Sequence, residues 1–209
     1  MRSAGVRSLS IAVLLMFALP AFGGGLTGKG FTAAFQNSGI HNPSIGQESI
    51  NSYAVGLVSE WSFTDRLSFQ PELTYDVRGF RRESFPGDKT DYQYHFIMGT
   101  ALAKLTESEG IVRPSVFTGL EIGWMVEATI DGETYRGLLS QTDRQHYGLV
   151  LGMGLDGPLG HGRWMVDARY CVGLNDLESE DAEWSVQPSD RLRTLMVSFK
   201  ILYGTDPYG

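Results

Sequence analysis

The sequence predicts an all-β fold: an eight-stranded antiparallel up-and-down transmembrane β-barrel with short periplasmic turns and long extracellular loops. After a leader of 23 residues, apolar and polar side chains alternate almost throughout, which is typical of strands with two different faces. The alternating segments number eight, an even number as in bacterial barrels, and the links between them are alternately short and long. No apolar stretch after the leader approaches the length of a spanning helix, and a closed barrel is the other structure that satisfies its backbone in lipid.

The first 23 residues have the features of a signal peptide. Arg2 and Arg7 precede an apolar run over residues 9–19, which a proline and several small residues follow. Because this run is shorter than the roughly 20 apolar residues of a spanning helix, cleavage is favoured over an uncleaved anchor. We therefore expect residues 1–23 to be removed on export and residues 24–209 to form one outer-membrane β-barrel domain.

Composition narrows the class of partner and cofactor. The 209 residues carry a net charge of −7 with no basic excess, so we expect no nucleic-acid partner. A single Cys excludes an internal disulfide framework and a cysteine-rich metal site. No motif in the sequence requires a metal, a cofactor or a catalytic residue, and we expect none of these.

The clearest strand covers residues 67–78, where twelve residues alternate without an exception. One face of this segment carries Leu67, Phe69, Pro71, Leu73, Tyr75 and Val77. The other seven predicted strands cover residues 28–36, 52–63, 91–103, 111–127, 146–156, 163–174 and 192–203. Each is near the 9–11 residues that a tilted membrane strand needs.

The lengths of the links indicate how such a barrel lies in a membrane. The links after the second, fourth and sixth strands are short, at residues 64–66, about 104–110 and 157–162. The links after the odd-numbered strands are about twice as long or more, for example residues 128–145 and 175–191. Both chain ends lie on the side of the short links, as in bacterial outer-membrane barrels.

Side-chain volume decides which face of the strands points outward, because a soluble ligand-carrying barrel has the same alternation with its apolar side inside. An eight-stranded barrel has an interior just wide enough for side chains to fill. The apolar face is too bulky for that space, and we expect it to meet lipid. Its large members include Trp61, Phe69, Tyr75, Phe96, Trp124 and Phe199.

The polar face has the composition of a narrow lumen, in which small residues leave room for long charged ones. Its glycines are Gly56, Gly99, Gly119, Gly123, Gly148, Gly152, Gly154 and Gly173. Its charged residues form a predicted structural cluster of Glu60, Glu72, Arg113, Glu121, Asp167, Arg169 and Lys200. Buried charges are tolerated when paired, so we expect Glu60, Glu72 and Glu121 to meet Arg113, Arg169 and Lys200 across the axis. An ion or proton path through the same residues is the alternative.

Several stretches resemble the outer-membrane β-barrel domain family described as porin-like or PorT-like. They are QPELTY at residues 70–75, RPSVFTG at 113–119, GLVLGMGL at 148–155 and ARYCVGL at 168–174. The resemblance implies an eight-stranded barrel in the outer membrane of a Gram-negative-type envelope, with some relatives linked to protein secretion and gliding machinery. Such barrels usually end on an aromatic residue, whereas here Tyr203 is followed by six further residues.

We expect an integral outer-membrane protein with a side-chain-filled lumen and a structural or interaction role, in surface contact or as a component of a secretion machinery. Its expected partners are outer-membrane lipid and envelope or secretion-complex proteins, and we expect a monomer without enzymatic activity. The alternatives are a small-solute or ion pore, a soluble periplasmic binding barrel, and a lipid-modifying barrel enzyme. The enzyme would need a nucleophile at the rim beside His95 or His146, and Ser140 lies close to the latter in sequence.

Overall fold

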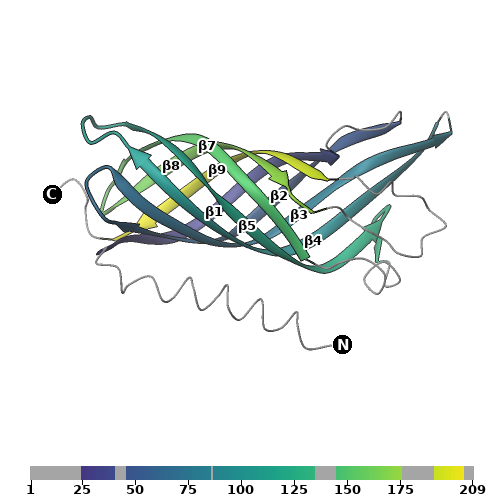
Figure 1. Ribbon diagram of the computed structural model, residues 1–209, viewed down its shortest axis with the longest axis horizontal. Coiled ribbons are helices and arrows are strands. Elements are labelled where there is room, and N and C mark those ends of the chain that lie inside the picture. Colours follow the sequence, from purple (N-terminus) through teal and green to yellow (C-terminus); the bar gives the residue numbers. More distant parts are fainter. Residues whose placement is uncertain (1–24, 41–45, 86, 135–144, 176–190, 205–209) are drawn as a thin grey trace.

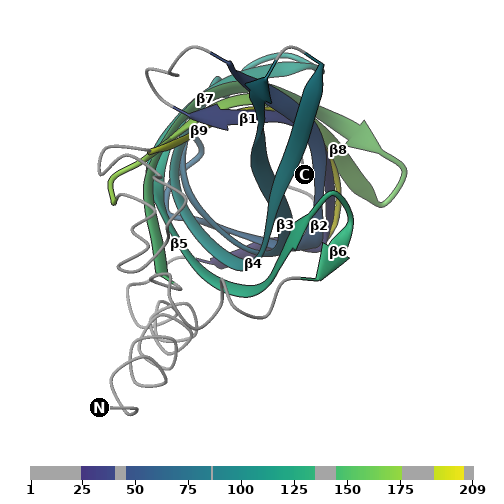
Figure 2. The same cartoon turned by 90° about the vertical axis from the view of Figure 1, so that its right-hand side faces the viewer.

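A computed structural model describes residues 25–40, 46–85, 87–134, 145–175 and 191–204, and it confirms the predicted closed antiparallel barrel (Figures 1 and 2). The strands are β1 (Gly25–Ile40), β2 (Gln47–Ser62), β3 (Leu67–Phe85), β4 (Asp88–Thr106), β5 (Arg113–Ile130), β6 (Glu133–Thr134), β7 (Gln145–Leu159), β8 (Gly162–Gly173) and β9 (Leu192–Tyr203). Eight of them pair with their neighbours in sequence, and the pairing of β1 with β9 closes the ring. The two-residue β6 pairs with the end of β5. The predicted signal peptide lies outside the described residues.

Among the described residues, no helix is long and apolar enough to cross a membrane.

The two ends of the barrel differ in how the strands are joined. At one end, which we call the turn end, short links at residues 63–66, 107–112 and 160–161 connect β2 to β3, β4 to β5 and β7 to β8. At the other end, the loop end, the sequence predicts a long loop between the third and fourth strands. This prediction is wrong, because β3 and β4 each continue to 19 residues and only residues 86–87 separate them.

The hairpin of β3 and β4 therefore projects beyond the rest of the barrel at the loop end (Figure 1). A strand rises about 3.3 Å per residue, so 19 residues far exceed the 9–11 that cross a membrane at a tilt. By comparison, β8 and β9 have 12 residues each. Among the described residues, the hairpin thus extends farthest from the membrane-crossing region.

The outer face of the membrane-crossing region is apolar, as the sequence predicts. Leu73 and Leu120 are 42% and 60% exposed, and their polar sequence neighbours Glu72 and Glu121 are buried. Other exposed apolar side chains on this belt are Phe31, Phe35, Val55, Leu57, Val116, Leu149, Leu151, Met153, Leu155, Val197 and Phe199. Side chains alternate between the two faces of a strand, so one parity of each strand faces outward and the other faces the axis.

The structure corrects two assignments on β4, where the even-numbered residues face the axis from Tyr94 to Lys104. Phe96, predicted to face lipid, is fully buried. Gly99, predicted to face the lumen, lies on the outer face of the same strand. Phe96 belongs to a buried apolar cluster that we call the loop-end core: Ile40, Phe80, Tyr94, Phe96, Met98, Met125, Ala128 and Leu192. Here the strands leave the lipid, so their outer face meets water and their apolar side chains gain by facing inward.

Glycines in the lumen wall accommodate large side chains from neighbouring strands. A Cβ at Gly148 would lie 2.6 Å from Oε1 of Glu121, and a Cβ at Gly152 would overlap the ring of Phe117. That ring in turn supports Arg169, whose guanidinium carbon lies 5.4 Å from the ring centroid. The glycines of β7 are therefore required by the size of the residues packed against them.

Candidate functional site

Charged side chains fill most of the lumen in three layers along the barrel axis. Among the described residues, six carboxylates and six Lys or Arg side chains are buried. The turn-end layer contains Glu60, Lys104, Arg113, Asp156 and Arg163; the middle layer contains Glu72, Asp167, Arg169 and Lys200; the loop-side layer contains Asp76, Arg78 and Glu121 with His146. The loop-end core adjoins the last of these layers, where the ring centroid of Phe96 lies 5.6 Å from that of His146.

The middle layer is a closed network across the barrel. Arg169 on β8 donates from both terminal nitrogens to the carboxylate of Glu72 on β3, at 2.7 and 2.6 Å. Its Nε donates to Asp167, two residues earlier on the same face of β8, at 2.7 Å. Lys200 on β9 pairs with both Asp167 and Glu72, and Ser198 donates to Asp167 at 2.8 Å. Two cations thus match two carboxylates, with charge-assisted bonds in a site closed to solvent.

The loop-side layer is organised around Arg78 on β3. Its terminal nitrogens donate to Glu121 on β5 at 2.6 and 2.9 Å, and Asp76 accepts from the same guanidinium at 2.9 Å. Nε2 of His146 lies 3.1 Å from Oε1 of Glu121. Gln36 donates to Asp76 at 2.5 Å and so joins β1 to this layer. Two carboxylates face one Arg here, with the histidine beside them.

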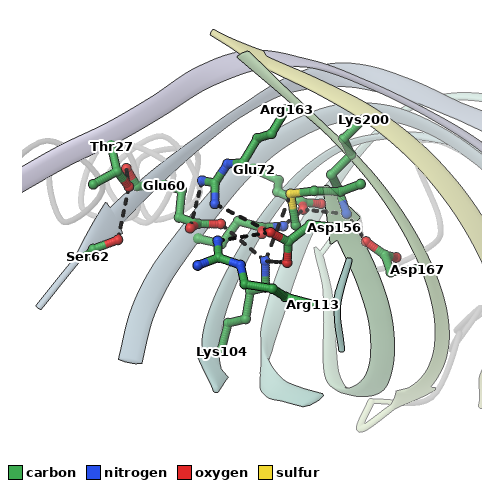
Figure 3. Close-up of polar contacts among 12 residues, drawn as sticks. Thr27, Glu60, Ser62, Glu72, Lys104, Arg113, Asp156, Arg163, Asp167 and Lys200 are labelled. Atoms are coloured by element: carbon green, nitrogen blue, oxygen red, sulfur yellow. Dashed lines mark hydrogen bonds and ion pairs between the residues drawn. The ribbon is translucent and has the colours of Figure 1, made fainter. Parts of the chain in front are cut away.

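The turn-end layer has the opposite balance, with three cations and two carboxylates (Figure 3). Arg163 on β8 lies 2.7 Å from Glu60 on β2, and Arg113 on β5 donates to Asp156 on β7 at 3.2 Å. Nζ of Lys104 lies between them, 3.4 Å from each carboxylate. Counted over Asp, Glu, Lys and Arg alone, the described part of the lumen is balanced in charge, but its turn end carries one surplus positive charge and its loop side one surplus negative charge.

The structure places all seven residues of the predicted cluster in the lumen, with partly different partners. Glu72 meets Arg169 and Lys200. The predicted partners of the other two acids are different in the structure: Arg78 and His146 contact Glu121, and Arg163 and Lys104 contact Glu60. Strand pairing decides these partners, and it cannot be deduced from alternation alone.

Five charged lumen residues are absent from the cluster predicted from the sequence: Asp76, Arg78, Lys104, Asp156 and Arg163. The sequence pattern does indicate Asp76 and Arg78, because they occupy the same alternate positions of β3 as Glu72 and therefore face the lumen with it. The predicted strand ends put Lys104 in a link and Asp156 and Arg163 at strand margins. The strands are longer than predicted at the turn end, and this brings all three into the lumen.

Two cavities show how far the lumen is open. Between the middle and loop-side layers lies a cavity of about 10 Å³, lined among others by Glu72, Arg78 and Arg169. This is about the space that one water molecule occupies. At the turn end lies a pocket of about 370 Å³, which we call the turn-end pocket, with Glu60, Arg113 and Arg163 among its lining residues. The lumen is therefore recessed at one end and closed at its middle.

The two histidines considered for catalysis lie in different environments. His146 is buried in the loop-side layer, whereas His95 is on the outer face and its Nδ1 lies 2.7 Å from the hydroxyl of Tyr75. Ser140 lies outside the described residues. No group of three or more His, Cys, Asp or Glu that could hold a metal ion occurs in the described part of the chain.

Comparison with known proteins identifies the family. The family described as "Outer membrane protein beta-barrel domain" matches residues 22–179. This chain belongs to that family. The barrel therefore belongs in the outer membrane, with its apolar belt in the lipid.

Solved outer-membrane barrels share the architecture at low sequence identity. Neisserial surface protein A is 15% identical, with 85% of this chain and 98% of that chain covered and a TM-score of 0.52. OprG from Pseudomonas aeruginosa is 12% identical, with 87% and 99% covered and a TM-score of 0.46. E. coli outer membrane protein W is 16% identical, with 85% and 98% covered and a TM-score of 0.43. No curated protein matches the sequence.

Proposed function

We propose that this outer-membrane barrel is a monomeric, non-conducting protein that acts through its exposed loop end, in surface contact or as a part of an envelope assembly such as a secretion machinery. The observation that carries the proposal is the closed middle of the lumen. Glu72, Asp167, Arg169 and Lys200 bridge the axis, and the cavity beside them measures about 10 Å³. Aqueous channels belong to barrels of about 16 strands, whereas eight strands enclose a space that side chains fill.

The projecting hairpin of β3 and β4 supports a contact role. Its base is stiffened by stacking of Phe80 on Tyr92, with ring centroids 5.2 Å apart. Near its tip, Lys89 lies 3.3 Å from Glu48 on β2, which ties the hairpin to the neighbouring strand. A paired and buttressed hairpin keeps its shape outside the membrane, and contact with another molecule then costs little conformational entropy.

Conductance across a planar lipid bilayer tests the closed lumen. We expect the purified wild-type protein to insert without producing steady current steps. A variant in which Glu72, Asp167, Arg169 and Lys200 are all replaced by Ala removes two charges of each sign and should conduct. That variant also shows that the assay detects an opened eight-stranded barrel. Steady steps from the wild-type protein, equal to those of the variant, would contradict the proposal.

We further infer that residues 1–23 are removed during export. The charged and apolar pattern of these residues supports this inference, and the family match begins at residue 22. The intact mass of the protein purified from outer membranes is the measurement. A mass that includes the leader would contradict cleavage and leave the barrel assignment unaffected.

A further inference from the structure

The turn-end pocket has the size and position of a ligand site. Its volume of about 370 Å³ lies within the range of roughly 300–1,000 Å³ that is usual for small-molecule sites. The link at residues 63–66 and the hydroxyl side chains of Thr106 and Ser108 line its mouth. Glu60, Arg113 and Arg163 line its inner part (Figure 3). The pocket is therefore recessed into the turn end, against the surplus positive charge of the turn-end layer.

The charge of this layer favours an anion. Arg113, Arg163 and Lys104 are each at most 6% exposed, and the buried carboxylates that they contact among the described residues are Glu60 and Asp156. Desolvated charge is costly unless it is compensated. The middle layer has no such surplus, although it lies in the same lumen. One bound anion would complete the charge balance of the turn-end layer.

Several polar groups of the pocket can donate hydrogen bonds, beside the carboxylates of Glu60 and Asp65. Oγ of Ser68 and Nε of Arg163 are buried, and neither has a hydrogen-bond partner among the described residues. Thr64 accepts hydrogen bonds from the backbone N–H of Arg66 and Leu67, at 3.3 and 3.0 Å, which leaves its hydroxyl hydrogen to donate. Guanidinium groups donate in a fork that matches the oxygens of phosphate. Donors on several strands suit a tetrahedral group better than a carboxylate with two oxygens.

We propose that the turn-end pocket binds a phosphate group, seated on Arg163 and Arg113 with Ser68 as a further donor. The group can come from a soluble phosphate or phosphate ester at the turn end, or from the headgroup of a phospholipid in the adjacent leaflet. The pocket and the closed middle layer are separate features. A barrel that conducted could still bind phosphate here, so the failure of one proposal leaves the other standing.

The test uses the full-length barrel in maltoside micelles free of phosphate and lipid. Inorganic phosphate should raise the thermal unfolding midpoint saturably, because it binds the folded state. Sodium acetate at equal ionic strength should not. Ser68→Ala should weaken phosphate binding about tenfold or more, because it removes one hydrogen bond to a charged acceptor. Ser115→Ala is the matched control, since Ser115 is also buried in the lumen but does not line the pocket.

Arg163→Gln should abolish the response to phosphate. If loss of the Arg163 charge prevents folding, the phosphate response of Ser68→Ala still tests the site. In phosphatidylglycerol nanodiscs, a retained response to added phosphate assigns the site to a soluble ligand, and a lost response assigns it to the lipid headgroup. The absence of a saturable response in micelles would overturn the proposal. An equal response in the Ser68→Ala and Ser115→Ala variants, or an equal effect of acetate, would overturn it as well.

Discussion

The two halves of the lumen differ in chemistry, although the same strands run through both. From the turn end to the middle, paired charges such as Glu72 and Arg169 cross the axis between two small apolar clusters. At the loop end the inward side chains are apolar, as with Phe80 and Phe96. The outer face changes in the reverse sense, from Leu73 in the membrane-crossing part to Arg81 and Asp91 in the hairpin. The barrel is therefore arranged as a membrane protein in one half and as a water-soluble β-structure in the other.

The surroundings of the outer face explain this difference. In lipid, apolar side chains gain nothing from being buried inside, and the interior is free to hold paired charges that tie the strands together. Outside the lipid, apolar side chains are driven inward by water. The change is visible along β3, where apolar residues hold odd positions up to Val77 and an even position at Phe80.

The largest loss of stability is expected when a charged partner is removed from the middle layer. Arg169→Ala leaves Glu72 and Asp167 with one cation and should lower the free energy of unfolding by about 3–5 kcal/mol. It should not open a large channel, because Glu72, Asp167 and Lys200 still cross the axis in this layer. Denaturant titration and bilayer conductance measure the two effects. Arg66→Ala is the control, because its exposed pair with Glu107 contributes about 0–1 kcal/mol; equal losses would show that the middle layer is not a stabilising network.

A loss of similar size is expected in the loop-end core. Phe96→Ala removes a fully buried ring and should lower the free energy of unfolding by about 3–5 kcal/mol through lost burial and the cavity left behind. Phe35→Ala, at an outward position that is 62% exposed, should cost less, because lipid fills the space that the ring leaves. If both variants lost equal stability in the same denaturant titration, the distinction between the two halves would not hold.

A smaller effect is expected from filling the space that a lumen glycine leaves. Gly152→Ala places a methyl group against the ring of Phe117 and should cost about 1–3 kcal/mol by overpacking. Gly25→Ala is its control, because no atom lies within 4 Å of the added Cβ there. The thermal unfolding midpoints of the two variants provide the comparison, and a midpoint for Gly152→Ala equal to that of wild type would mean that the ring moves freely.

The ion pair in the hairpin should have a small effect that depends on pH. The hydrogen bond from Arg81 lowers the pKa of the Asp91 carboxyl. A lowered pKa stabilises the folded state above the unfolded value of about 3.9, and this contribution is lost as the pH falls through the folded value. Asp91→Asn should therefore lower the unfolding midpoint slightly at pH 7, and the difference from wild type should shrink as the pH falls below about 4 and vanish once Asp91 is protonated in the folded state. A difference that persists in acid would exclude this carboxylate as the cause.

Spin labels perturb the barrel least and locate the boundary between the halves. Labels at Leu73 and Leu120 should report hydrocarbon, with collision rates higher for oxygen than for a water-soluble nickel complex. A label at Gln93, also on the outer side of its strand but beyond the belt, should report water. Water at Leu73 and Leu120 would mean that the apolar belt does not face lipid.

Much of the fold could be predicted because one residue pattern encodes it. Unbroken alternation over residues 67–78 gives the strand and its two faces, and the predicted strand at 192–203 matches β9 residue for residue. The seven charged residues predicted from the polar face of the strands lie in the lumen for the same reason. The position of Phe96 could not be predicted by this route, since alternation shows two faces and does not show where the lipid ends.

The pairs within the lumen required the folded barrel. Glu72 and Arg169 are 97 residues apart in sequence, and only closure of the sheet brings β3 opposite β8. The turn-end layer also depends on the extension of β4 to Lys104 and beyond, which joins it to Glu60 and Asp156. The sequence by itself determined the strands, their faces and the outward direction of the apolar belt, because these follow from local periodicity and side-chain volume. Only the tertiary structure decided which charges pair and where a surplus remains, because these depend on the register and closure of strands far apart in the chain.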